Sequence, residues 1–321
     1  TLDGAQRNVG ANQLTCASAL GNAAVITGVL GASAPAILAR HCLPWTNPFY
    51  NNRNVSESVS EDNLSGTIKA SYRLNESVLA YVSYARGYKS FGYNQDRVQN
   101  GVTPVNSLFF PSEEVDSYEF GVKTTLFNRT MLLNATYFDQ TFTDFQLNAF
   151  VVESIPELTT RGVDADFLWF TPIEGLTLGG GITYTDAQFG RFTAADLAIP
   201  GNFGQLSLLP GAAPSFAPEG SYVGSINFER SIGNGLRAGF SLAGKYQTDY
   251  NTGSDLLPFK EQEGFGTLNG RISIGTEDER WTLEAWAQNL TDEEYVQVAY
   301  NAFLQGSAFQ STVQPNGTFY N

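Results

Sequence analysis

The stretch LRAGFSLAGKYQTDY, residues 236–250, decides the fold class of this chain. One parity of the stretch is apolar or glycine, from Leu236 through Phe240 to Tyr250, and the other carries polar and charged residues such as Arg237 and Lys245. Successive side chains of a β-strand point to opposite faces of the sheet. A period of two therefore predicts a strand with one apolar and one polar face.

The same alternation recurs along most of the chain, in about ten segments. We place them at roughly 66–74, 78–86, 114–127, 130–143, 160–171, 176–187, 220–230, 235–249, 265–276 and 281–291. Several are longer than the ~5–6 residues of ordinary strands and reach the ~9–11 that a tilted transmembrane strand needs. The apolar parity is rich in aromatic residues toward the segment ends, which is typical of the interfacial girdles of a membrane barrel.

The connections between these segments alternate in length. Short ones, rich in Asn, Gly, Pro and Asp, fall at 75–77, 128–129, 172–175, 231–234 and 276–280. Long ones cover about 87–113, 144–159, 188–219 and 250–264. A soluble sheet has no reason to sort its loops by end, whereas an outer-membrane barrel has short periplasmic turns and long extracellular loops. The pattern predicts an all-β, transmembrane antiparallel β-barrel.

Composition excludes several function classes. The net charge of −14 makes nucleic acid a poor partner. The single histidine, His41, and the lack of a nucleophile–base set or phosphate loop argue against an enzyme, and we expect no cofactor. The acidic loop residues have no metal-ligand spacing, so we expect no metal site and interpret them as a solvated surface.

The alternation divides the chain into three regions: 1–64, an extracellular loop region; 65–291, the barrel strands with their loops; and 292–321, an extracellular loop before a missing last strand. Cys16 and Cys42 lie in the first region, and in an oxidising envelope compartment we expect them to form a disulfide. The apolar run 23–39 is rich in Ala and Gly, and we expect a short helix in an external loop rather than a membrane span or a targeting segment.

Four further motifs lie at Tyr81–Asn94, Pro111–Lys123, Thr160–Asp166 and Trp281–Tyr295. In order and spacing they resemble the barrel of TonB-dependent outer-membrane receptors, and the resemblance covers about 80–295. It implies that the ten segments are part of a barrel of about 22 strands in the outer membrane of a Gram-negative bacterium. It also implies a plug and an energising periplasmic partner, for which this chain shows no segment. Because an open sheet edge is unstable in lipid, we expect another chain to complete the barrel.

The resemblance implies a receptor for a scarce solute, such as a siderophore, cobalamin or a glycan, imported across the outer membrane with energy from the periplasmic partner. Aromatic and amide side chains of the loops could contact such a small-molecule or glycan ligand, although they could equally hold loop against loop. The candidates are Tyr88, Phe91, Tyr93, Asn94, Phe109, Phe110, Tyr250, Tyr300 and Phe303. The scarcity of loop cations favours a neutral or glycan-like ligand. A passive pore or structural barrel protein and a soluble β-rich surface protein are the alternatives.

Overall fold

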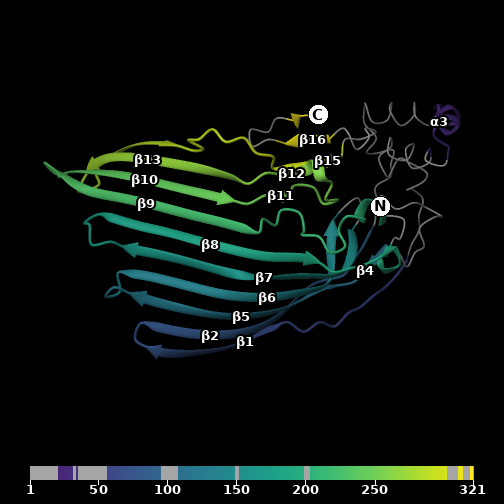
Figure 1. Cartoon of the computed structure of the whole chain (residues 1–321), viewed down its shortest axis with the longest axis horizontal. Helices are drawn as coiled ribbons and strands as arrows, with labels where there is room; N and C mark the ends of the chain where they lie inside the picture. Colours follow the sequence, from purple (N-terminus) through teal and green to yellow (C-terminus); the bar gives the residue numbers. More distant parts are fainter. Residues whose placement is uncertain are drawn as a thin grey trace.

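The computed structural model describes residues 21–31, 34, 56–94, 108–148, 152–198, 203–301, 310–313 and 319–320. Its main feature is one antiparallel sheet of ten strands in the order β1-β2-β5-β6-β7-β8-β9-β10-β13-β14 (Figure 1). The strands are β1 (Gly66–Asn75), β2 (Val78–Lys89), β5 (Glu113–Leu126), β6 (Met131–Asn148), β7 (Val152–Phe170), β8 (Leu176–Phe189), β9 (Gly220–Gly233), β10 (Leu236–Gln247), β13 (Phe265–Thr276) and β14 (Thr282–Ala287). The ten predicted strands are confirmed.

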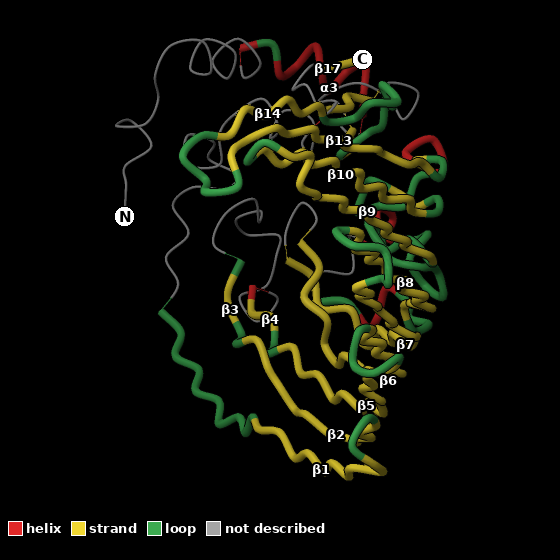
Figure 2. Tube along the Cα trace, turned by 90° about the vertical axis from the view of Figure 1, so that its left-hand side faces the viewer, coloured by secondary structure: helices red, strands yellow, loops and turns green. Residues whose placement is uncertain are grey.

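The sheet curves into an open trough rather than a closed barrel, as the view along the strands shows (Figure 2). Within the described residues, β1 and β14 each pair with one long strand only and form the two edges. The predicted partial barrel is confirmed, and the described strands leave it open.

Strand register gathers the apolar residues on one face of the sheet. Val82 lies opposite Phe120, and Phe120 lies opposite Tyr137. Phe120 keeps 54% of its surface exposed, as expected of a side chain on the lipid-facing side of a membrane barrel. Aromatic pairs bound this face at both ends: the rings of Tyr84 and Tyr118 are 5.1 Å apart toward the long loops, and those of Phe127 and Trp169 are 6.0 Å apart toward the short turns.

The other face of the sheet is polar, and its side chains bond to one another across the strands. The Thr183 hydroxyl donates to Asp164 at 2.8 Å, and Nδ2 of Asn134 donates to Asp166 at 3.0 Å. A membrane barrel turns its apolar face to lipid and its polar face to the lumen. We therefore assign the polar face to the concave side of the trough and call it the inner wall.

The short turns all lie at one end of the sheet, the left-hand end in Figure 1. Several of their residues have positive φ, among them Asn128 (55°), Asn234 (57°) and Gly175 (82°). Glycine is required at 175 because a Cβ there would collide with the carbonyl oxygen of Glu229. Turn residues and tight backbone angles together confirm the predicted short connections.

The long connections at the opposite end contain further small elements. They are α3 (Ala23–Leu30), β3 (Gly92–Tyr93), β4 (Phe109–Phe110), η3 (Ala194–Asp196), α5 (Phe203–Leu206), β11 (Tyr250–Asn251), η5 (Pro258–Lys260), β12 (Glu261–Gln262), β15 (Val298–Asn301), β16 (Gln310–Val313) and β17 (Phe319–Tyr320). The last three form a small sheet of their own within the region predicted as a loop, 292–321. Among the described residues, no helix is long and apolar enough to cross a membrane.

One predicted loop is wrong. The connection expected at about 144–159 is mostly strand, because β6 continues to Asn148 and β7 begins at Val152. Both parities of the added part are buried: Ile155 is 0% exposed and Ser154 is 6% exposed. A strand buried on both faces loses the polar–apolar alternation by which the other strands were recognised.

Candidate functional site

The candidate site is the long-loop end of the sheet, where five of the predicted contact residues meet in one hairpin. Strands β3 and β4 pair with Gly92 opposite Phe110 and Tyr93 opposite Phe109. The Phe109 ring lies 5.7 Å, between centroids, from the rings of both Phe91 and Tyr93. These distances are typical of packed aromatic pairs, so the three rings hold the hairpin together.

Asn94 fastens this hairpin to the start of β7. Its Nδ2 donates to the carbonyl of Val152 at 2.8 Å, and the Val152 amide donates back to Oδ1 at 2.9 Å. The backbone N–H of Asn94 also donates to the carbonyl of Leu108 at 2.8 Å, and Asn94 is only 6% exposed. We call these contacts the Asn94 clamp. They explain the asparagine as a structural residue and leave it little surface for a ligand.

Gln146 of β6 supports the same hairpin from below. Its Nε2 donates to the carbonyls of Ser90 at 2.9 Å and of Pro111 at 3.0 Å, the residues that lead into and out of the hairpin. Its backbone amide donates to Glu113 at 2.8 Å. Sequence reasoning missed Gln146 because it lies in the stretch predicted as a loop.

Tyr88 and Tyr250 differ from the hairpin residues. Tyr88 is the second-last residue of β2 and is 49% exposed. It shares the parity of Val82 but lies beyond the ion-paired Arg86, at the loop end of the strand. Tyr250 of β11 is partly buried, and its ring lies 6.3 Å from that of Phe216 in the preceding loop. Burial raises the pKa of Tyr250, so its hydroxyl remains a hydrogen-bond donor well above neutral pH. Among the predicted contacts that the structure places, it therefore separates one exposed aromatic, Tyr88, from several that are at least partly buried in the loops.

The loop from β10 to β13 is held by a buried ion pair that the sequence did not predict. The Lys260 amine lies 2.7 Å and 2.8 Å from the two carboxylate oxygens of Asp255, and Lys260 is 4% exposed. The fully buried Thr252 donates its hydroxyl to the carbonyl of Lys260 at 2.7 Å. We call Thr252, Asp255 and Lys260 the polar knot. Lys260, one of the few cations of the loops, is thereby enclosed within its own loop.

An apolar cluster holds the remaining long loop, between β8 and β9, against the top of β7. Its buried members are Ile155, Leu158, Phe189, Phe192, Leu197, Leu206 and Leu209. Leu256 of the polar-knot loop packs against it, so two loops share this support. The sequence did not predict the cluster, because its members are scattered along the chain and come together only in the folded structure.

Several predicted residues cannot be placed. Cys16, Cys42 and Phe303 lie outside the described residues, as does the predicted disulfide, and Tyr300 is described only as part of β15. In the part of the chain that the structure describes, no three His, Cys, Asp or Glu side chains are grouped closely enough to hold a metal ion. The ligand contacts remain predictions.

Comparison with protein-family models identifies the family of this chain. The model described as TonB dependent receptor-like, beta-barrel matches residues 44–290, which include all ten strands of the sheet. The chain belongs to the TonB-dependent receptor family. Receptors of this family lie in the outer membrane of Gram-negative bacteria, so the predicted localisation is confirmed.

Solved receptor structures share the fold. The ferric yersiniabactin uptake receptor FyuA from Yersinia pestis is 21% identical, with a TM-score of 0.62 over 79% of this chain and 36% of its own. The ferric preacinetobactin receptor BauA from Acinetobacter baumannii is 17% identical, with a TM-score of 0.55 over 72% of this chain and 32% of its own. The siderophore receptor PiuA from the same organism is 14% identical, with a TM-score of 0.54 over 74% of this chain and 33% of its own. The chain thus spans about a third of the receptors it resembles.

Proposed function

We propose that this TonB-dependent receptor chain supplies part of the wall and of the binding face of a transporter that imports a scarce solute across the outer membrane. The observation that carries the proposal is the family match over residues 44–290, together with the collection of all long loops at one end of the sheet. A loop end facing the medium can capture a solute, and the polar inner wall can line its route inward.

We propose a ferric siderophore complex as the solute. Support comes from the solved structures with the same fold, whose names include receptors for ferric yersiniabactin and ferric preacinetobactin. Cobalamin and glycan-like solutes are the alternatives to be tested alongside. The exposed ring of Tyr88 is the contact that we favour, because an aromatic face can pack against the ring systems of a chelator.

Charge at the loop end bears on the choice of solute. Arg86 pairs with Glu114, Lys260 pairs with Asp255, and Lys89 lies 4.0 Å from Glu113. A cation already paired with a carboxylate offers little to a second anion. Arg191 is exposed and has no ion pair among the described residues, so it is the loop cation open to an anionic group. We therefore propose that the described part of the loop end holds its solute mainly through aromatic and neutral polar contacts, with Arg191 as the available cation.

We propose that import draws on an energising periplasmic protein, reached through a plug that residues 1–321 do not provide, and that the chain carries out no enzymatic reaction. The apolar face contacts outer-membrane lipid throughout. A passive pore would instead conduct small solutes with no energising partner.

Iron-limited growth tests the function directly. The full-length receptor is expressed in a Gram-negative strain that lacks its own siderophore receptors, and growth and iron uptake are measured on a panel of ferric siderophores, with cobalamin and glycans as separate arms. We expect uptake of one siderophore, its loss when the energising partner is deleted, and a marked reduction in Tyr88→Ala but not in the lipid-facing Val82→Ala. Uptake of cobalamin or a glycan alone would replace the solute, and flux that survives deletion of the partner would favour the passive pore.

A further inference from the structure

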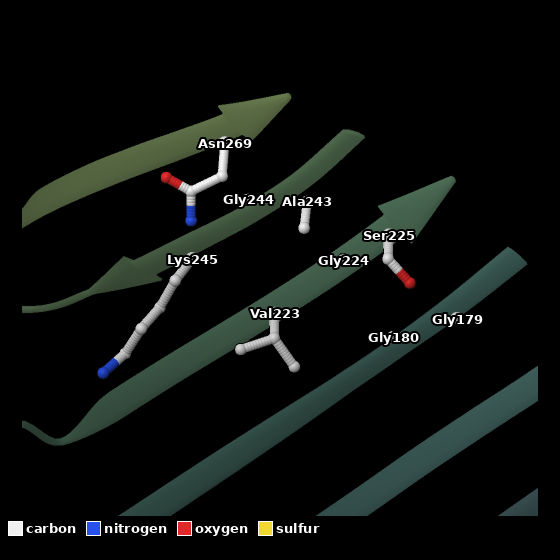
Figure 3. Close-up of a pocket in the computed structure, with 9 residues that line it drawn as sticks. All are labelled: Gly179, Gly180, Val223, Gly224, Ser225, Ala243, Gly244, Lys245 and Asn269. Carbon is white, nitrogen blue, oxygen red and sulfur yellow. The ribbon is translucent and has the colours of Figure 1, made fainter. Parts of the chain in front are cut away.

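The inner wall contains a hollow of ≈ 340 Å³ that the loop-end site does not involve (Figure 3). Strands β8, β9, β10 and β13 line it. Gly179, Ser225, Ala243 and Asn269 lie in one row across these strands, and Lys245 lies in the next row toward the loops. Figure 3 shows the side chains of Ser225, Ala243, Lys245 and Asn269 on the same side of the sheet.

Small residues create this space. Gly179 has no side chain, and a Cβ there would lie 2.8 Å from the Ser225 hydroxyl, so the glycine is needed for the serine to lie over it. Ala243 adds only a methyl group between Ser225 and Asn269. The volume is within the range of ~300–1,000 Å³ for small-molecule sites.

Asn269 is turned so that it can only donate into the hollow. Its Oδ1 accepts the backbone N–H of Asn289 at 2.9 Å, which leaves the amide nitrogen facing away from that bond. The backbone of Glu293 holds the Asn289 side chain in turn. Nδ2 of Asn289 donates to the Glu293 carbonyl at 2.9 Å, and the Glu293 N–H donates to Oδ1 of Asn289 at 3.0 Å. The strand-exit motif at residues 289–293 therefore fixes the direction of a donor on the inner wall.

Lys245 is the exposed cation beside this donor. Within the described residues, no carboxylate lies within ion-pair distance of its amine, whereas the other cations of this part of the inner wall are paired: Arg237 with Glu229 at 3.2 Å and Arg271 with Glu284 at 3.2 Å. Asp164 and Asp166 of β7 accept hydrogen bonds from Thr183 and Asn134, respectively. The hollow thus combines a positive charge, an oriented amide donor and the Ser225 hydroxyl, with no acidic side chain among its lining residues.

We propose that this hollow is a binding site for a carboxylate group. A carboxylate accepts hydrogen bonds only, so it matches a set of groups that can donate, and charge-assisted bonds to an ammonium are the stronger kind. The carboxylate can belong to a solute crossing the lumen or to a protein segment that lies against the inner wall. The first source rests on the proposed function, whereas the site itself does not.

Lysine NMR on the full-length receptor tests the site without any transport. The lysines are labelled by reductive ¹³C-methylation, which keeps their charge, and the Lys245 signal is assigned with Lys245→Arg. Succinate is the probe, and Lys123 is the matched control because it is a second lysine on the inner wall, on β5, and is not among the residues that line the hollow. We expect succinate to shift the Lys245 signal saturably and to leave that of Lys123 in place.

Two variants keep Lys245 as the reporter and change the hollow around it. Asn269→Ala removes the amide donor, and we expect succinate to bind about fivefold more weakly, the equivalent of ~1 kcal/mol for one hydrogen bond. Ala243→Leu fills the space, and we expect the shift to disappear. Far-ultraviolet circular dichroism and heat-modified gel mobility verify that each variant is folded.

The two sources give different results. A solute site gives the saturable shift. A protein carboxylate gives no succinate shift, but the methylated amine at Lys245 then keeps its proton to a higher pH than the methylated amine at Lys123. The proposal is overturned if Lys245 and Lys123 behave alike, either by shifting equally with succinate or by showing neither the shift nor the raised titration. Each of these results can be obtained whether or not the receptor imports a siderophore.

Discussion

Two long loops at the same end of the sheet are held by opposite means. The loop between β8 and β9 rests on the apolar cluster, in which Leu206 is 2% and Leu209 0% exposed. The loop between β10 and β13 encloses the polar knot, with Lys260 bonded to Asp255. Apolar burial is non-directional and tolerates changes of shape, whereas a buried ion pair depends on both partners being present. The long-loop end, or rim, of this receptor therefore combines a support that tolerates side-chain changes, the apolar cluster, with one that does not, the polar knot.

The largest effect is expected from removing one partner of the polar knot. Asp255→Ala leaves the ammonium of Lys260 buried without its carboxylate, which costs ~3–5 kcal/mol in comparable buried pairs. Hydrogen–deuterium exchange of the amides at 252–260 in the full-length receptor measures the local opening. The double variant Asp255→Ala/Lys260→Met should recover most of the protection, and equal exchange in the single variant and the wild type would show that the pair carries no stability.

The apolar cluster should lose somewhat less from one truncation. Leu209→Ala removes a fully buried side chain, and such changes cost ~2–5 kcal/mol depending on how far the site relaxes. Exchange of the amides at 203–212 is the measurement. Leu208→Ala is the matched control because its side chain is 44% exposed, and similar effects of the two variants would contradict the cluster as the support of this loop.

The Asn94 clamp should be weaker than either support. Asn94→Ala removes two hydrogen bonds to the backbone of Val152, and we expect a loss of ~1–3 kcal/mol, since the buried amide and carbonyl of that residue lose their partner. Limited proteolysis of the connection 90–112 in folded receptor detects the released hairpin. Asn94→Asp keeps the acceptor for Val152 N–H and should fall between the alanine variant and the wild type; cleavage of all three at the same rate would remove the clamp from the comparison.

The smallest effect on folding is expected at Tyr88. Its exposed ring makes Tyr88→Ala a surface change, and we expect a shift within ~0.5 kcal/mol in stability. Tyr88 thus separates the two properties of the rim: exchange protection should stay at the wild-type level while siderophore uptake falls. Loss of protection comparable to that of Asn94→Ala would show that this ring, too, is a support and not a contact.

How much of the fold the sequence predicts depends on where each strand lies. Strands with one apolar and one polar face alternate in polarity, and all ten were recognised, most of them within a few residues of their ends. The exceptions are the upper parts of β6 and β7. There Gln146 and Ser154 are buried on one face and Glu153 and Ile155 on the other, so the alternation disappears and a loop was predicted instead.

The supports of the rim were beyond the reach of the sequence for a different reason. Lys260 and Asp255 lie five residues apart, and nothing in the sequence around them shows that they form a buried pair. Asn94 was predicted as a ligand contact because amides suit ligands, yet its partner Val152 lies 58 residues away. Such pairings are set by the three-dimensional meeting of loops, which local patterns do not encode. The predicted contacts at Tyr88 and Tyr250 stay predictions.

The order of the strands also has a consequence for how the sheet forms. Every long strand pairs with the next long strand along the chain, so each hairpin can close before the following one begins. Loop closure costs only ~0.6 kcal/mol more for each doubling of loop length, and contacts between sequence neighbours favour rapid folding. The sheet can then grow hairpin by hairpin. Pairing of β8 with β9 spans the longest connection between long strands, so it has the largest loop-closure cost of these steps.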